Sequence, residues 1–129
     1  MRRQIIAFIS ALVTWVAVVS VLNRLLRSGL SGYAAAEPVM AFTSTMLWLR
    51  LAMGAAASVS AGYVLGRVAP PAHRAALILG GLLVAAFVPV HYQLWSRFPA
   101  WYHAAFLLSI VPLVSLGARL GRSSASPAA

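Results

Sequence analysis

Four long apolar segments, separated by short polar connections, set the pattern of this chain. The first, residues 5–22, contains only Ser10, Thr14 and Ser20 as polar interruptions. Segments of this length match the roughly 20 residues that a helix needs to cross the hydrocarbon core of a bilayer. The pattern predicts an all-α membrane protein whose four transmembrane helices form an antiparallel up-down bundle, in one domain of residues 1–118. The expected spans are approximately residues 5–26, 38–66, 74–95 and 100–118.

Residues that start or stop helices mark the connections between these spans. Glu37 and Pro38 are typical of a first helical turn, because an acid favours the positive end of the helix dipole and proline lacks a donor that is unpaired there. Pro70 and Pro71 predict the end of that helix. Residues 119–129 end in serine, alanine and one proline, and they predict a disordered cytoplasmic tail.

A cleaved signal peptide is the alternative interpretation of the first apolar segment. Arg2 and Arg3 precede the segment, and the alanines at 34–36 resemble a cleavage site. The segment is longer than the approximately 7–15 apolar residues of a signal peptide, and the alanines lie well beyond its end. These two observations favour an uncleaved span.

Composition excludes several classes of function. With 62% hydrophobic and 9% charged residues, the chain has too few polar residues to cover the core of a soluble domain. Its basic residues are all arginine, and most lie at the ends of apolar segments, where they act as topology signals rather than as a nucleic-acid interface. The expected partner is therefore the lipid bilayer and not nucleic acid. Cysteine is absent and Glu37 is the only acid, so thiol chemistry and paired carboxylates are excluded, and an enzyme is not expected.

The arginines at the ends of the spans predict the orientation of the bundle. Cytoplasmic connections carry the larger number of arginines, so both termini are expected in the cytoplasm, with insertion in both orientations as the alternative. The arginine-only set and the abundant alanine suggest a bacterial protein, and hence a multi-pass protein of the inner membrane. The richer side holds Arg2, Arg3, Arg67, Arg74, Arg119 and Arg122, and the other side holds Arg24, Arg27 and Arg97.

Aromatic residues gather on the side that carries fewer arginines. Tyrosine and tryptophan favour the membrane interface, because their rings are apolar and their polar tips require water. This pattern predicts an outer interfacial belt and no ligand site. The belt residues are Trp48, Tyr92, Trp95, Trp101 and Tyr102.

Small residues spaced by four predict helix packing, because close backbone contact replaces the hydrophobic effect between helices in lipid. Gly54, Ser58 and Gly62 are expected to share one contact. The bundle itself, a second copy of the chain or another membrane protein would each satisfy these faces. The complete predicted set is Gly54, Ser58, Gly62, Gly66, Gly81, Ala85, Gly117 and Gly121.

Arg50 is a charged residue inside the second span, which marks it as a functional candidate. One interpretation is a contact with an anion or another substrate in a helical cavity. The other is that the side chain reaches a lipid phosphate, or pairs with hydroxyl and carbonyl groups, and the nearby Trp48 favours this view. Pro89 and Pro112 lie inside the last two spans, where broken helices form some transport sites and ordinary kinks are common.

His91 and His103 flank the turn between the last two spans. Two histidines can ligate haem or a metal. A zinc site needs three or four ligands, and no cysteine or acid is nearby. We therefore expect no metal and no cofactor, with both histidines at the interface, and a bis-His haem protein is the remote alternative.

Residues 90–120 combine an aromatic end at 92–95, the run FPAWYH at 98–103, Pro112 and Gly117. In these features the segment resembles the last hairpin of small four-span bacterial inner-membrane proteins of unknown function. The resemblance covers about a quarter of the chain, implies a multi-pass membrane protein and brings no activity with it.

Two functions remain for such a chain. The absence of catalytic residues and the small-residue faces favour a non-enzymatic scaffold or accessory subunit. Arg50 and the two prolines within spans indicate the alternative, a small oligomeric channel or carrier for an anion or small solute.

Overall fold

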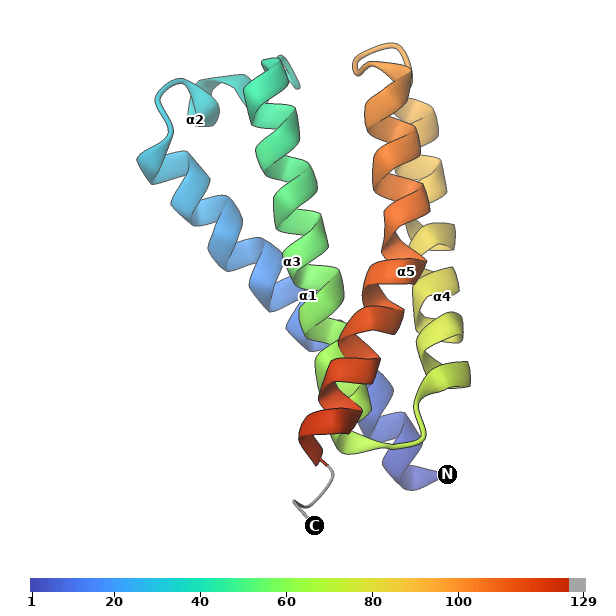
Figure 1. Ribbon diagram of the computed structural model, residues 1–129. Helices are drawn as coiled ribbons and strands as arrows, with labels where there is room; N and C mark the ends of the chain where they lie inside the picture. The colour runs from blue at the N-terminus through green and yellow to red at the C-terminus, as the bar shows by residue number, and fades with distance from the viewer. Residues whose placement is uncertain (126–129) are drawn as a thin grey trace.

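The computed structural model describes residues 1–125, which fold into helices joined by short connections (Figure 1). Four of the helices are long and apolar enough to cross a membrane. The predicted all-α architecture with four candidate spans is therefore confirmed, and α2 is an additional single turn. The helices are α1 (Arg2–Gly29), α2 (Tyr33–Ala36), α3 (Ser44–Val68), α4 (His73–Gln93) and α5 (Ala100–Ala125).

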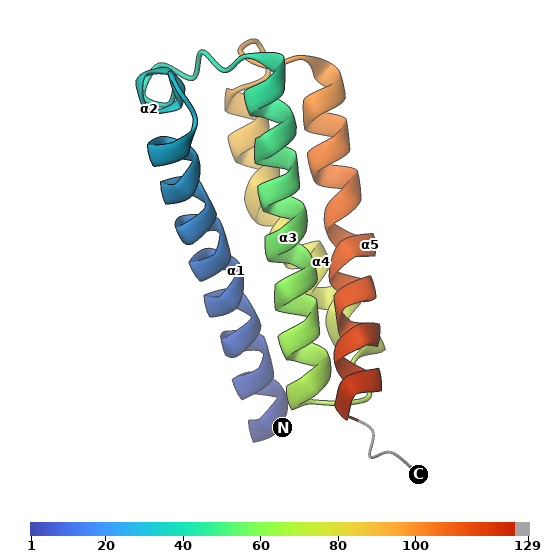
Figure 2. The ribbon, with the colours of Figure 1, turned by 60° about the vertical axis from the view of Figure 1, so that its left-hand side comes forward.

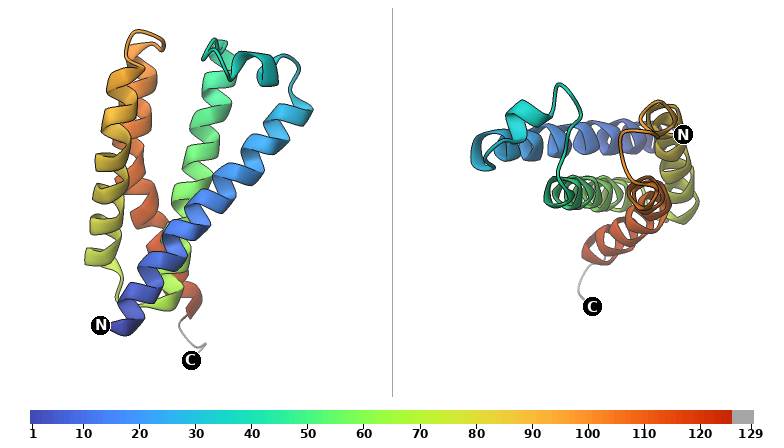
Figure 3. Two further views of the ribbon diagram at one scale, coloured as in Figure 1. Left: turned by 180° about the vertical axis from the view of Figure 1, so that it is seen from behind. Right: turned by 90° about the horizontal axis from the view of Figure 1, so that it is seen from above.

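The long helices run alternately up and down. The N-terminus and the end of α5 lie at one end of the bundle, here called the terminal end, and α2 lies at the opposite end, here called the α2 end (Figure 2). Helices that follow each other in sequence are not always neighbours in space. α3 makes its largest interface with the parallel helix α5, while α1 packs on α3 and α4 packs on α5 (Figure 3).

The second span begins later than the sequence pattern predicts. α3 starts at Ser44, and the Thr43 side chain caps it by accepting a hydrogen bond from the Met46 amide at 3.3 Å. The expectation of a helix start at Glu37 and Pro38 is therefore wrong. Glu37 instead closes the short helix α2, and its carboxylate is drawn towards α1 by an ion pair described below.

The last helix extends beyond the predicted span. α5 continues through Arg119 to Ala125, so the expectation of a disordered tail is wrong for residues 119–125. Residues 126–129 lie outside the described part of the chain. The extension is explained by packing, because Gly121 still contacts α3. Pro89 and Pro112 lie inside α4 and α5 without ending either helix.

Two glycine pairs bring α3 and α5 into backbone contact near the terminal end. A Cβ atom at Gly62 would overlap the Val114 carbonyl oxygen, and one at Gly66 would overlap the same group of Ala118. On the opposite helix, Gly117 and Gly121 fit against the backbone of α3 in the same way. Two Gly-x-x-x-Gly motifs of one chain therefore interlock, as small residues do where membrane helices cross closely.

The other predicted packing residues have different partners. Gly54 lies against the Phe106 ring of α5, whereas the buried Ser58 accepts a hydrogen bond from the Trp15 indole of α1 at 3.2 Å. The expected single contact through Gly54, Ser58 and Gly62 is therefore divided between two helices. Gly81 and Ala85 are exposed and open. In α4 it is the adjacent Gly80 that packs, against Val111 of α5.

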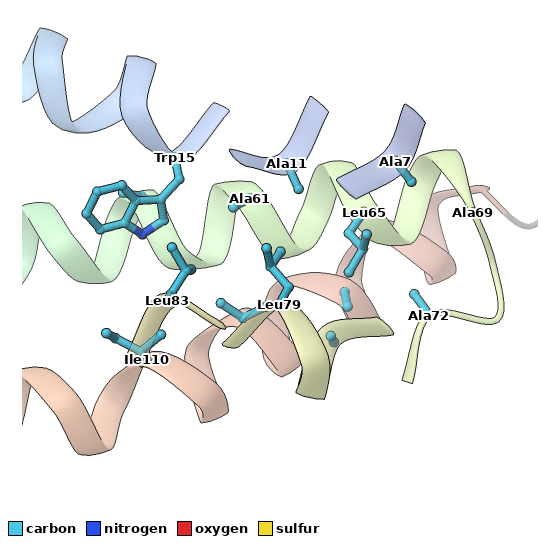
Figure 4. Close-up of a cluster of buried hydrophobic side chains, with 14 residues drawn as sticks. Ala7, Ala11, Trp15, Ala61, Leu65, Ala69, Ala72, Leu79, Leu83 and Ile110 are labelled. Atoms are coloured by element: carbon cyan, nitrogen blue, oxygen red, sulfur yellow. The ribbon is translucent and has the colours of Figure 1, made fainter. Parts of the chain in front are cut away.

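Small residues also set the contact of α1 with the bundle. Ala7, Ala11 and Trp15 are its buried residues, and they lie on one side of the helix facing α3 (Figure 4). Alanine permits close approach near the terminal end, where Leu65 and Leu79 meet the same cluster. The rest of α1 is broadly exposed and apolar, as expected for a surface covered by lipid.

Candidate functional site

A continuous chain of polar contacts joins α1, α2 and α3 at the α2 end. Arg27 forms an ion pair with Glu37 at 3.1 Å, and Asn23 donates to the same carboxylate at 2.9 Å. The Tyr33 hydroxyl donates to the Asn23 side-chain oxygen at 2.9 Å and accepts from Arg50 Nη1 at 2.7 Å. Asn23 and Tyr33 each donate one bond and accept another, while the Glu37 carboxylate accepts from both Arg27 and Asn23, so these contacts support one another.

The short helix α2 places Tyr33 at the centre of this chain of contacts. Gly32 precedes it with a φ of 80°, a left-handed conformation that glycine adopts without steric cost and that turns the chain back over α1. The Tyr33 ring is fully buried, together with Ala36 and Met46. Burial of the ring fixes the hydroxyl between Asn23 and Arg50, which makes Tyr33 a positioning residue for the arginine.

Arg50 has neutral neighbours. Its guanidinium lies over the Phe42 ring, with Cζ 4.6 Å from the ring centre, in a cation–π contact. Tyr102 of α5 is a further neighbour. Within the described residues the Arg50 Nε atom is buried and has no hydrogen-bond partner. A buried donor without a partner is costly, and a ligand that reached this atom would remove that cost.

Two cavities border Arg50. One of about 370 Å³ lies between α1, α3 and the connection after α2, and its lining includes Asn23 and Glu37. The other, of about 140 Å³, extends among Trp15, Tyr102 and aromatic residues of α4 and α5. Both cavities share Arg50 in their lining, so a group that enters either one can reach the guanidinium.

The charges of this site do not cancel. Arg27 and Arg50 contribute two positive charges, and Glu37 contributes one negative charge, which leaves one positive charge in excess. Glu37 is the only acidic side chain of the chain, and its oxygens are engaged by Arg27 and Asn23. The excess charge thus resides at Arg50, beside the cavities, where an anion would be attracted.

His91 and His103 lie beneath this site and face each other. Both are buried, with their Nδ1 atoms 2.7 Å apart, and aromatic rings surround them. The expectation that they lie at the interface is therefore wrong, because the antiparallel ends of α4 and α5 bring them together inside the protein. At this distance one ring donates a proton and the other accepts it.

The spacing of the histidine pair fits a hydrogen bond and not a shared metal. Two imidazole nitrogens that each bind zinc at about 2.0–2.1 Å lie more than about 3 Å apart, and ligands on opposite sides of one metal lie about 4 Å apart. Within the described residues no group of three or more His, Cys, Asp or Glu side chains gathers. The geometry gives the bis-His haem alternative no support.

Replacing only one of the two histidines is expected to lower the free energy of unfolding by more than half of the loss caused by replacing both. His91→Phe and His103→Phe should each lower the free energy of unfolding by about 1–3 kcal/mol, because each leaves the other buried ring without its partner. The double replacement removes both polar groups and should cost less than the sum. Unfolding of the purified protein by SDS titration in mixed micelles measures all three, and additive losses would contradict the hydrogen bond.

The predicted aromatic belt is divided between the surface and the interior. Trp48 and Trp101 stack on each other with ring centres 5.0 Å apart, and Tyr92 and Trp95 are also exposed. Tyr102, in contrast, is buried and packs on Phe98, so its assignment to the belt is wrong. The hydroxyl of Tyr102 faces Arg50 instead of the interface.

The sequence pattern indicates Arg50 as a candidate but not the residues that hold it. The sequence pattern places Asn23 inside the first predicted span, Tyr33 in the connection that follows and Glu37 at a helix start. The available signal was the single acid of the chain, because a lone carboxylate in an arginine-rich membrane protein is expected to find a cation. Only the fold shows that Arg27 is that cation and that Tyr33 links the pair to Arg50.

Comparison of the chain with protein-family models, curated proteins and solved structures finds no match. The resemblance of residues 90–120 to small bacterial four-span proteins therefore stays a prediction. Functional conclusions rest on the geometry of the site itself.

Proposed function

We propose that this membrane protein binds a small anion at Arg50 and acts as a carrier or channel component for that anion. The observation that supports this proposal is the excess positive charge of Arg50, with a buried free Nε, beside two cavities. Charged residues inside a span are costly and accompany substrate or ion pathways. Arginine suits carboxylates and inorganic oxyanions, because its planar head carries several donors.

The size of the site indicates the class of anion. A cavity of about 370 Å³ holds a small carboxylate or inorganic anion with a few waters, given the approximately 30 Å³ that one water occupies in the liquid. The aromatic walls of the smaller cavity favour an anion with an apolar part. With both termini in the cytoplasm of a bacterial cell, as the arginine count predicts, the α2 end would face the outside of the inner membrane.

A scaffold or accessory role is the second proposal, and the exposed apolar face of α1 supports it. The Gly-x-x-x-Gly faces of α3 and α5 are already occupied by each other. A partner helix, whether from a second copy or another membrane protein, would therefore contact α1, whose buried residues are confined to Ala7, Ala11 and Trp15. A scaffold role predicts no anion binding, so one experiment discriminates between the two proposals.

Arg50→Ala is expected to weaken anion binding by about 10- to 100-fold, because a hydrogen bond to a charged group contributes about 1.5–3 kcal/mol. Binding of acetate, benzoate and chloride to the purified protein is measured by calorimetry, and uptake of the same labelled anions is measured in proteoliposomes. Arg50→Lys keeps the charge and should retain part of the binding.

Arg97→Ala is the matched control for this measurement. Arg97 lies at the same end of the bundle, is exposed and donates to the Val39 carbonyl group. Its removal changes the net charge equally but leaves the cavities unchanged. Equal binding and uptake by wild type, Arg50→Ala and Arg97→Ala would refute the anion proposal and favour the scaffold.

A further inference from the structure

The terminal end of the bundle is rich in arginine and contains no acidic side chain. Its arginines lie at the start of α1, the end of α3, the start of α4 and the end of α5, and these segments meet at this end of the bundle (Figure 1). The single acidic side chain, Glu37, lies at the opposite end and is paired with Arg27. The described part of the terminal end thus carries arginine side chains and no carboxylate side chain, a distribution of charge that attracts anions.

A cavity of about 350 Å³ opens at this end between the start of α4 and the last turns of α5. Ala72, Ala76 and Ala118 form part of its wall, and their small side chains leave room for a ligand. The polar and charged residues that line the cavity are His73, Ser115, Arg119 and Arg122. The Ser115 hydroxyl oxygen is buried and has no hydrogen-bond partner within the described residues.

The start of α4 supplies backbone donors to the same cavity. The first N–H groups of a helix have no partner within the helix, and Ala72, at the N-cap position, offers no side-chain cap. The positive end of the helix dipole adds to the attraction for an anion. His73 also borders a second cavity, of about 680 Å³, whose lining includes Arg3 and Arg74.

We propose that the cavity at the start of α4 binds a phosphate group through Arg119, Arg122, His73 and the first amides of α4. Several cations and a helix start converge on one space, and phosphate offers the charge and the number of oxygens that such an arrangement engages. The position at the membrane boundary fits an anionic lipid headgroup, because basic pockets between membrane helices bind such lipids. A soluble phosphate compound presents the same chemistry.

The test measures phosphate-group binding to the full-length protein purified in detergent. In the lipid arm, native mass spectrometry compares phosphatidylglycerol with phosphatidylcholine. In the soluble arm, calorimetry compares inorganic phosphate with chloride at equal ionic strength. We expect preferential binding in one arm, which identifies the source, and an approximately 25-fold weakening in the Arg119→Gln/Arg122→Gln variant, about fivefold for each arginine.

Three further variants make the result decisive. Arg24→Gln/Arg97→Gln removes the same charge at the α2 end and should bind like the wild type. His73→Gln changes an exposed side chain and should weaken binding without disturbing the fold, even if the double variant is unstable. No preference in either arm, or equal weakening by the two double variants, would overturn the proposal. Measured in the Arg50→Ala background, the same comparison excludes any phosphate bound at the Arg50 site, so this proposal and the proposed function can fail separately.

Discussion

Gly62→Ala is expected to lower the free energy of unfolding by about 3 kcal/mol or more, at the upper end of the cost of overpacking. The added methyl group would overlap the Val114 carbonyl oxygen and approach the Ala118 amide. Both are backbone groups, so no side-chain rotation relieves the clash. α3 and α5 would have to separate, and the largest interface of the bundle would lose contact along its length.

Gly81→Ala is the matched control. Gly81 is also a helical glycine, but a Cβ atom there would meet nothing within 4 Å. Its replacement should be neutral or stabilise by up to about 1 kcal/mol, because alanine favours helix more than glycine does. SDS unfolding of both variants gives the comparison. If Gly62→Ala and Gly81→Ala behave alike, the close crossing of α3 and α5 is wrong.

Tyr33→Ala is expected to be the other severe change, with a loss of about 3–5 kcal/mol, as for other buried aromatic residues. The replacement empties the cluster beneath α2 and removes the hydroxyl that joins Asn23 to Arg50. Tyr33→Phe separates the two effects. It keeps the ring and leaves two polar groups without a partner, which should cost about 1–3 kcal/mol.

Tyr92 provides the control for these variants. It lies at the same end of the bundle and is 82% exposed. Tyr92→Ala and Tyr92→Phe should therefore change the free energy of unfolding by less than about 0.5 kcal/mol. Tyr33→Phe should also weaken anion binding at Arg50, because the guanidinium loses the group that orients it. Wild-type stability in Tyr33→Ala would show that α2 does not hold the α2 end together.

The effects of these two changes should be separable, because they act at different parts of the bundle. Gly62 lies in the crossing of α3 and α5, whereas Tyr33 joins α1, α2 and α3. Changes at distant sites without shared partners are usually additive. When the anion affinity is measured on the folded fraction of each variant, only the Tyr33 variants should differ from the wild type.

The pattern of apolar segments was sufficient to predict the architecture. A helix satisfies its own backbone hydrogen bonds, so an apolar segment of the right length in lipid has almost no alternative to a helix. The four spans, the glycine pairs Gly62–Gly66 and Gly117–Gly121, and the presence of a charged residue, Arg50, inside a span all follow from local sequence. Errors at the ends arose where tertiary contacts compete with local signals, as at Glu37, which pairs with Arg27 instead of starting a helix.

Partner choice could not be predicted, because it depends on which helix faces reach the same space. The spacing of Gly62 and Gly66 does not reveal that they pack beside Gly117 and Gly121 of the same chain. Those glycines belong to α5, which runs parallel to α3 and does not follow it directly in the sequence. His91 and His103 were visible as a pair, but their burial and hydrogen bond depend on the antiparallel ends of α4 and α5. The sequence by itself determined a four-span membrane protein with one costly internal charge. Only the tertiary structure decided that Tyr33 and Asn23 tie this charge to Glu37 and Arg27, because those contacts form only when α2 folds back across the ends of α1 and α3.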